Sequence, residues 1–154
     1  MSFVQIEHLV VRYGKVVAVR NLSLAIERQE VFGFIGPNGA GKTSTLKVLA
    51  TLLPPAEGTV KIDGMRVERQ PHAIRSRIGY MPDFFGTYDD LTVEEYLHFF
   101  AAAYRIGRRE RTTVVGDVLA LTDLADKRDA AVDALSRGMK QRLGVARLLI
   151  HDPD

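Results

Sequence analysis

The hydrophobic pattern at the start of the chain predicts two β-strands. The stretch SFVQIEHLVVRYG at 2–14 is rich in strand-forming residues and ends at a Tyr-Gly turn. In VAVRNLSLAIERQE at 17–30, Leu22, Leu24 and Ile26 alternate with other residues and so share one face. We therefore expect an antiparallel β start that is half exposed.

A strand, a loop and a helix are expected next, in that order. VFGFIG at 31–36 is a short apolar run that ends in glycine, which is typical of a buried strand. A polar, glycine-rich loop follows it. KTSTLKVLATLL at 42–53 then carries leucines at helical spacing, and Pro54-Pro55 ends this helix.

The next segment predicts a hairpin, a short helix and another strand. GTVKIDGMRV at 58–67 would turn at Asp63-Gly64. Pro71 suits the first turn of a short helix, and IGYMP at 78–82 is typical of a brief buried strand. The chain up to this point is expected to form a mixed α/β core.

From about residue 90 the pattern changes to that of amphipathic helices. Thr92 and Glu95 form a capping box at the start of the first helix. Its apolar stripe consists of Val93, Tyr96, Leu97, Phe100 and Tyr104. A second helix is expected over about 110–124, and a third begins near Ser136.

Composition narrows the classes of protein. The chain has 154 residues, 46% of them hydrophobic and 26% charged, which is typical of one soluble globular domain. It contains no cysteine, which excludes thiol catalysis, disulfides and zinc–thiolate sites. No window approaches the roughly 18 to 20 apolar residues that cross a bilayer. MSFVQIEHLV has neither a basic leader nor a long apolar stretch, so we do not expect it to be a secretory signal. Any membrane role is thus expected to depend on a partner.

Positive charge is clustered at one place only. The net charge is +2, and RIGRRERTT at 105–113 is the only dense basic run. We interpret this run as a solvated helix start, with a nucleic-acid patch as the less favoured alternative. No nucleic-acid partner is therefore expected.

GPNGAGKT at 36–43 fits the phosphate-loop pattern G-x-x-x-x-G-K-[ST]. Its glycines would let the backbone approach phosphate oxygens, so that successive amide N–H groups surround the anion. The helix that starts at Gly41 or Lys42 would add the positive end of its dipole. The candidate nucleotide-binding residues of the loop are Gly36, Pro37, Asn38, Gly39, Ala40, Gly41, Lys42, Thr43 and Ser44.

Two side chains of this loop have distinct expected roles. Lys42 would place a point charge on the β- and γ-phosphates, and the Thr43 hydroxyl would be a hard oxygen ligand for Mg²⁺. The alternative is an ordinary glycine turn with a solvated lysine. The position of the pattern, between an expected strand and an expected helix, favours nucleotide binding.

The stretch LSRGMKQRL at 135–143 places Ser136 and Gly138 at the start of the last helix. Alone, Ser136 could be simply an N-cap worth about 1 kcal/mol. Behind a phosphate loop, however, the stretch resembles the signature motif of the nucleotide-binding subunits of ABC transporters.

The resemblance covers the whole chain. Tyr13 before Gly14 is similar to the family's A-loop aromatic residue, 36–43 to its Walker A motif, IGYMPD at 78–83 to its Q-loop region and LSRGM at 135–139 to its signature. The stretches YMPDFFGTYDDLTVEEYLHFF and LSRGMKQRL are most similar to those of bacterial ABC-2 type, multidrug-like exporters. The resemblance implies an α/β P-loop NTPase fold in a single, incomplete domain over 1–154. Its expected parts are a β subdomain with the P-loop core at 1–82, a helical subdomain at 83–135 and the signature helix at 136–154.

The same resemblance implies a mechanism. Two such subunits would form a homodimer or heterodimer, with ATP and Mg²⁺ between the P-loop of one and the signature of the other. Tyr13 would stack on the adenine, and the opposite-protomer contacts would come from Ser136, Arg137, Gly138 and Met139. ATP hydrolysis would drive transport through a transmembrane permease, which would hold the subunit at the inner, cytoplasmic face of the cell membrane. Phe84, Phe85 and Tyr88 are expected either to contact that permease or simply to pack within the helical subdomain.

Three positions depart from the family pattern. Asp83 stands where the family usually has glutamine; it could ligate Mg²⁺ but would add negative charge beside the phosphates. Arg137 replaces a usual glycine and Met139 a usual glutamine. Arg137 would either contact the opposing nucleotide or point to solvent.

The Mg²⁺-shell aspartate, the catalytic glutamate and the γ-phosphate histidine of the family have no match in this sequence. No apolar strand precedes Asp152, Asp154 and His151, so we assign none of the family's catalytic roles to them. We expect the general base to lie after Asp154. The C-terminal part of the core is expected to be missing, and the chain alone is not expected to hydrolyse ATP. The alternatives are a short ATP-binding module that does not hydrolyse, and an ABC-type ATPase without a transport role.

Overall fold

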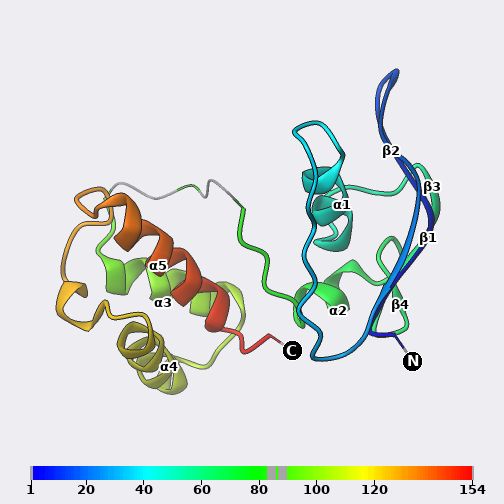
Figure 1. Ribbon diagram of the computed structural model, residues 1–154. Coiled ribbons are helices and arrows are strands. Elements are labelled where there is room, and N and C mark those ends of the chain that lie inside the picture. Colours follow the sequence, from blue (N-terminus) through cyan, green and yellow to red (C-terminus); the bar gives the residue numbers. More distant parts are fainter. Residues whose placement is uncertain (1, 83–85, 87–89, 154) are drawn as a thin grey trace. The chain divides into compact units, whose positions relative to one another are not determined.

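The computed structural model describes residues 2–82, 86 and 90–153. The expectations for Asp83, Phe84, Phe85 and Tyr88 therefore lie outside the described residues. The chain divides into two compact units, Met1–Arg75 and Ser76–Asp154, seen as the sheet-containing and the helical parts of Figure 1. Each unit is described by itself.

The first unit contains an antiparallel sheet with the strand order β2-β1-β3-β4 (Figure 1). Its strands are β1 (Val4–Tyr13), β2 (Val16–Ile26), β3 (Glu57–Ile62) and β4 (Met65–Arg66). The expected antiparallel start is confirmed, since β1 pairs with β2 along its length. The expected hairpin is also confirmed: Ile62 pairs with Met65 across Asp63-Gly64, whose φ angles of 48° and 75° suit a tight two-residue turn.

Two short helices, α1 (Lys42–Leu49) and α2 (Pro71–Arg75), complete the first unit. Most of its buried apolar side chains come from the sheet and from both helices, namely Ile6, Leu9, Val11, Val19, Val48, Val60, Ile62 and Ile74. The helix expected over 42–53 is shorter than predicted. It ends at Leu49, before the prolines, because Ala50 caps it and Thr51 has a positive φ angle.

The expected strands at 31–36 and 78–82 are not formed, and both predictions were wrong for this chain. In the first segment Val31 is 100% exposed and Ile35 is 97% exposed. A buried parallel strand requires neighbours that take its backbone hydrogen bonds. The sheet of the described residues consists of β1–β4 alone, so an apolar sequence is not sufficient to make either segment a strand.

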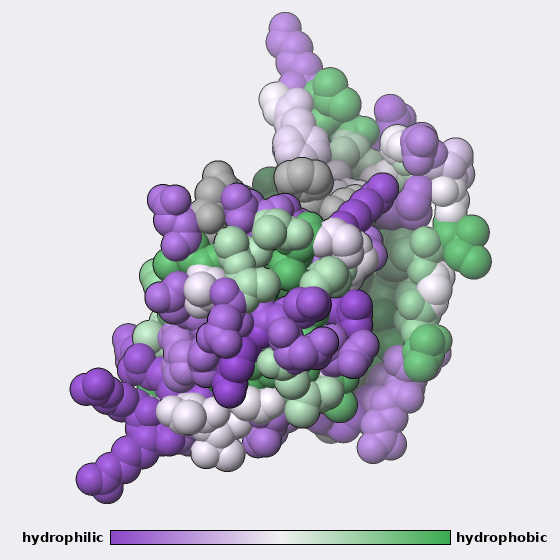
Figure 2. Space-filling view, turned by 90° about the vertical axis from the view of Figure 1, so that its left-hand side faces the viewer, coloured by the Kyte–Doolittle hydropathy of each residue, from purple (hydrophilic) through white to green (hydrophobic). Residues whose placement is uncertain are grey.

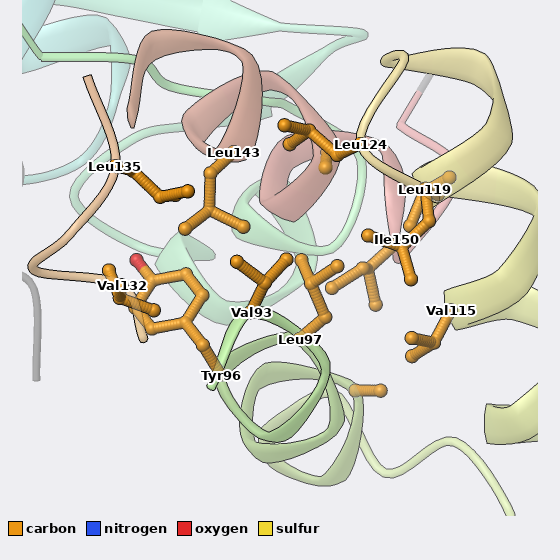
Figure 3. Close-up of a cluster of buried hydrophobic side chains, with 13 residues drawn as sticks. Val93, Tyr96, Leu97, Val115, Leu119, Leu124, Val132, Leu135, Leu143 and Ile150 are labelled. Carbon is orange, nitrogen blue, oxygen red and sulfur yellow. The ribbon is translucent and has the colours of Figure 1, made fainter. Parts of the chain in front are cut away.

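The second unit is helical, with α3 (Val93–Ala103), α4 (Arg108–Leu121), the 3₁₀ turn η1 (Ala125–Lys127) and α5 (Arg137–Leu149). Most of the predicted stripe of α3 points into its core, where Val93, Tyr96 and Leu97 are fully buried (Figure 3) and Phe100 packs against them. The prediction was wrong for Tyr104, which caps the end of α3 and is 40% exposed. Leu143 of α5 and Leu119 of α4 close this core from the other helices. No helix of the described residues is long and apolar enough to cross a membrane.

The predicted capping box begins α3. The Thr92 backbone N–H donates to Glu95 Oε2 at 2.9 Å, and the Glu95 N–H donates to Thr92 Oγ1 at 3.2 Å. Hydrogen bonds from the Thr92 backbone, and then from its side chain, lower the pKa of Glu95. They do so because they favour the ionised carboxylate.

The lowered pKa of Glu95 predicts a pH-dependent contribution to stability. This contribution is complete above the unfolded pKa, about 4.3 for glutamate, and is lost as the pH falls through the lower folded value. Between about pH 5 and pH 3, the melting temperature of the wild type should fall more steeply than that of Glu95→Gln, which does not titrate. Parallel melting curves for the two proteins across this range would contradict the prediction.

Three helices end in the same left-handed turn without using glycine. After α1, α3 and α4, the residues Thr51, Arg105 and Asp123 have φ angles of 59°, 64° and 56°. After α1, the Leu52 N–H donates to the Lys47 carbonyl at 2.8 Å, which is the wide bond of a Schellman motif. Glycine is the residue usually found at this position.

Thr51 is the least suited of the three, because a β-branched residue rarely adopts positive φ. Arg75 holds it in place, with Nε donating to Thr51 Oγ1 at 2.6 Å and Nη2 donating to the Thr51 carbonyl at 2.9 Å. Thr51→Gly and Thr51→Ala both lose the hydroxyl contact, but only glycine removes the strain. We expect Thr51→Gly to exceed Thr51→Ala in unfolding free energy by about 1 kcal/mol. Equal stabilities in denaturant titrations would refute this assignment.

Candidate functional site

The glycine-rich loop leads into α1 as expected from its sequence. Gly41 is the N-cap, with φ 86°, and the helix begins at Lys42. Gly41 provides no side-chain cap, and the first turn contains no acidic residue. The positive end of α1 is thus not neutralised by its own side chains, which favours an anion there.

Two glycines of the loop serve different purposes. Gly39 has φ 83° but open space around its α-carbon, so it supplies only the backbone conformation. Gly41 also packs closely on β2: a Cβ at this position would lie 2.5 Å from the Ala18 carbonyl oxygen and 2.7 Å from Val19 Cγ2. The loop is therefore held directly against the backbone of β2.

The Lys42 side chain folds over the start of the loop. Its Nζ donates to the Gly36 carbonyl at 2.6 Å and to the Pro37 carbonyl at 2.7 Å. An ammonium group has three N–H donors, so one remains for a further acceptor. The two carbonyl contacts fix the charge beside the loop amides.

The hydroxyl groups of the first turn of α1 differ in their surroundings. Thr43 is exposed and Ser44 is partly buried, whereas Thr45 is 1% exposed. Thr45 Oγ1 donates to the Gly41 carbonyl at 3.1 Å, so this hydroxyl is used within the helix. Sequence reasoning did not name Thr45, although threonine often bonds the carbonyl four residues earlier in a helix. Only Thr43 and Ser44 therefore present hydroxyls at the surface of the loop.

Tyr13 lies next to this loop although it is distant in the sequence. It is the last residue of β1, and its side chain is 46% exposed. Its hydroxyl donates to Ser44 Oγ at 3.4 Å. The structure thus brings together Tyr13 and the first turn of α1, both of which were selected from the sequence.

An open cavity of about 540 Å³ lies between the loop and β2. It is lined by Gly39 and Ala40 of the loop, Phe34, Thr45 and the β2 residues 17–23. Its volume lies in the range of small-molecule sites. The β2 residues were not predicted, because nothing in their sequence indicates that the phosphate loop packs beside them.

The stretch 135–139 forms the start of α5. Ser136 is its N-cap, and Ser136 Oγ accepts a hydrogen bond from the Met139 N–H at 3.3 Å. Ser136, Arg137 and Gly138 are exposed, and a Cβ on Gly138 would meet no atom within 4 Å. The capping role of Ser136 is confirmed, and the first turn remains open to solvent.

The described residues offer one candidate side-chain ligand for magnesium, the hydroxyl of Thr43. No group of three or more His, Cys, Asp or Glu side chains that could hold a metal occurs in the described part of the chain. Magnesium usually keeps several water ligands and takes only one or two from protein when it is bound to nucleotide phosphates. The exposed Thr43 hydroxyl could provide one such ligand, while Asp83 falls outside the described residues.

Comparison with known proteins gives consistent results. A family model described as ABC transporter matches residues 19–154. The ABC transporter ATP-binding protein NatA of Bacillus subtilis (strain 168) is 40% identical over 138 residues, which are 89% of this chain and 56% of that protein. The Nod factor export ATP-binding protein I of Ralstonia nicotianae is 40% identical over 149 residues, which are 97% of this chain and 46% of that protein. The chain spans about half the length of these curated relatives.

Solved structures agree in fold. An ATP-binding subunit of an ABC transporter superimposes with a TM-score of 0.85 at 27% identity, covering 99% of this chain and 63% of the other. The protein cbiO1 from Clostridium perfringens, described as part of the ABC transporter complex cbiONQ, superimposes with a TM-score of 0.81 at 24% identity, covering 99% of this chain and 62% of the other. The expected fold class is confirmed by these likenesses. The chain belongs to the ABC transporter family, and its relatives are the ATP-binding proteins of that family.

Proposed function

We propose that this chain binds MgATP as the nucleotide-binding part of an ABC transporter. The observation that carries the proposal is the start of α1, where a glycine N-cap, an unneutralised helix end and the fixed ammonium of Lys42 converge. Backbone amides, a helix dipole and a lysine together favour a polyphosphate. The membership of the family supports ATP as its source.

The roles within this site follow from chemistry. Lys42 would carry the charge opposite the β- and γ-phosphates, and the amides from Gly39 to Thr43 would surround the phosphate oxygens. The Thr43 hydroxyl would hold Mg²⁺, which neutralises phosphate charge when it is bound. The ring of Tyr13, exposed beside Ser44, would provide a stacking surface for adenine.

The start of α5 would serve the nucleotide of a second subunit. Ser136, Arg137 and Gly138 are exposed at a helix N-terminus that has no acidic residue in its first turn. We propose a head-to-tail homodimer or heterodimer in which this turn and Met139 face the partner's γ-phosphate. Exposure of Arg137 is compatible with such a contact.

Hydrolysis and transport are proposed for the complete assembly. In the described part of the chain, no carboxylate makes a hydrogen bond or ion pair with Lys42 or Thr43. We therefore expect these residues to bind MgATP without turnover, and a general base to come from outside them. A short module that only binds ATP remains the second candidate, favoured by the same observation.

A membrane permease is the proposed partner, and it would hold the chain at the cytoplasmic face. The names of relatives support this, since one describes Nod factor export and another a probable multidrug ABC transporter. In the helical unit Phe99 is 49% exposed and Leu121 is 73% exposed. Figure 2 shows hydrophobic patches interspersed with hydrophilic ones on the face it presents, which is compatible with a protein contact.

Calorimetric titration of the purified chain with MgATP, MgADP and AMP tests the proposal. ATP and ADP should bind measurably and AMP far more weakly, because the β-phosphate is the group that the loop amides and Lys42 surround. Similar affinities for AMP and ATP would contradict a phosphate-loop site. Absence of ATP binding by a folded chain would reject the proposed function.

A further inference from the structure

The phosphate loop packs directly against the first hairpin, near its tip. Tyr13 ends β1 and pairs with Val16 across the Gly14-Lys15 turn, so its position is fixed by the hairpin. The loop meets the other strand of this hairpin, since Gly41 lies against the Ala18 carbonyl with no room for a Cβ. The position of Tyr13 relative to the start of α1 is therefore determined by backbone packing.

This packing places two hydroxyl groups in contact. The Tyr13 hydroxyl donates to Ser44 Oγ at 3.4 Å, and no other hydrogen bond of Ser44 through its side chain occurs in the described residues. A serine hydroxyl has one proton to donate and two lone pairs to accept. When Ser44 Oγ accepts from Tyr13, its own proton remains free for an acceptor in the loop.

We propose that Tyr13 is a positioning residue for phosphate as well as a surface for the base. Its hydroxyl orients Ser44 Oγ so that the Ser44 proton is presented to a phosphate oxygen of the nucleotide. Hydrogen bonds arranged in such a chain strengthen one another. The inference rests on the proposed nucleotide site, and it assigns to Tyr13 a function that a phenylalanine at this position would lack.

Tyr13 would act through Ser44, because Ser44 Oγ is the polar atom that its hydroxyl contacts. Lys42 Nζ is held by the Gly36 and Pro37 carbonyls, and Thr45 Oγ1 is bonded to the Gly41 carbonyl. Both of these side chains are thus engaged with carbonyls of the loop, whereas the Tyr13 hydroxyl is directed to Ser44. Because the Tyr13–Ser44 contact is long, the expected effect is modest, about two- to fivefold in affinity.

Tripolyphosphate separates this function from adenine stacking because it has no base. Calorimetry or competition with a fluorescent nucleotide would measure its affinity for the wild type, Tyr13→Phe, Ser44→Ala and the double variant. Tyr13→Phe keeps the aromatic ring and should weaken tripolyphosphate binding by about two- to fivefold. In the Ser44→Ala background the same change should have no further effect. Ser44→Thr, which restores a hydroxyl, should restore the sensitivity to Tyr13→Phe.

The outcomes distinguish the inference from the proposed function. Unchanged tripolyphosphate binding in Tyr13→Phe, or the same loss with and without the Ser44 hydroxyl, would overturn the inference and leave ATP binding intact. The same cycle measured with MgATP provides a second reading, since the Tyr13→Phe variant keeps a ring that can stack on adenine. Failure of the wild type to bind either ligand, with a normal melting transition, would instead reject the proposed site. Equal melting temperatures for wild type and Tyr13→Phe exclude unfolding as the cause of a loss.

Discussion

Lys42→Ala should remove most of the affinity of this chain for MgATP. The Lys42 ammonium lies beside the loop amides, fixed by the Gly36 and Pro37 carbonyls, where it retains a donor for a phosphate oxygen. A charge-assisted hydrogen bond contributes about 2 to 3 kcal/mol, which corresponds to a roughly 30- to 150-fold increase in the dissociation constant. Calorimetric titration with MgATP measures this change directly.

Lys47→Ala is a matched control for Lys42→Ala. Lys47 is on the same helix and exposed, but it lies in the last turn, away from the loop. Its removal changes the net charge equally and should leave MgATP affinity within about twofold, since exposed charges at this distance are screened by salt. An equal loss in both variants would show that general charge, and not the position of Lys42, determines binding.

The features that the sequence predicted well are those determined by neighbouring residues. The capping box of Thr92 and Glu95, the Asp63-Gly64 hairpin and the Ser136 N-cap each depend on a few adjacent positions, and each is present. Such motifs satisfy backbone groups within one turn, so their sequence signature carries almost all of the required information. The phosphate loop belongs to the same class, which is why its glycine N-cap at Gly41 was predicted to within a residue.

The features that the sequence did not predict depend on distant partners. Segments 31–36 and 78–82 have the composition of buried strands, but a strand forms only beside another strand, and no pattern within them specifies that neighbour. The left-handed end of α1 was also missed. Thr51 is an unsuitable residue for positive φ, and its support comes from Arg75, which is 24 residues away.

The two parts of the candidate site differ in how far the sequence predicts them. The spacing of its own residues predicts the phosphate loop, whereas only the family resemblance indicates a role for Tyr13. The structure adds a physical relation between them, the contact of Tyr13 with Ser44. It also shows that Gly41 packs against β2. From the P-loop pattern alone, this glycine would be explained only by the approach of the backbone to phosphate.

Among glycine-to-alanine substitutions in this loop, Gly41→Ala should cause the largest loss of stability and of MgATP affinity. At φ 86° any Cβ is strained by about 1 to 2 kcal/mol. Here it would also lie 2.5 Å from the Ala18 carbonyl oxygen, a backbone atom of β2 that has no rotamer by which to move away. Displacement of the loop from β2 adds about 1 to 3 kcal/mol, and it shifts the N-terminus of α1 away from its phosphate-binding position. We expect a marked fall in melting temperature and at least a tenfold loss of MgATP affinity, a factor that corresponds to about 1.4 kcal/mol.

Gly39→Ala separates conformational strain from steric overlap. Gly39 has nearly the same φ, 83°, but a Cβ there would meet no atom within 4 Å. It should therefore lose only the conformational part, about 1 to 2 kcal/mol, and remain more stable than Gly41→Ala by the overlap contribution. Chemical denaturation of the three proteins gives this order directly. Equal stabilities for Gly39→Ala and Gly41→Ala would mean that the loop can leave β2 at no cost, and that the packing of Gly41 on Ala18 does not position the phosphate site.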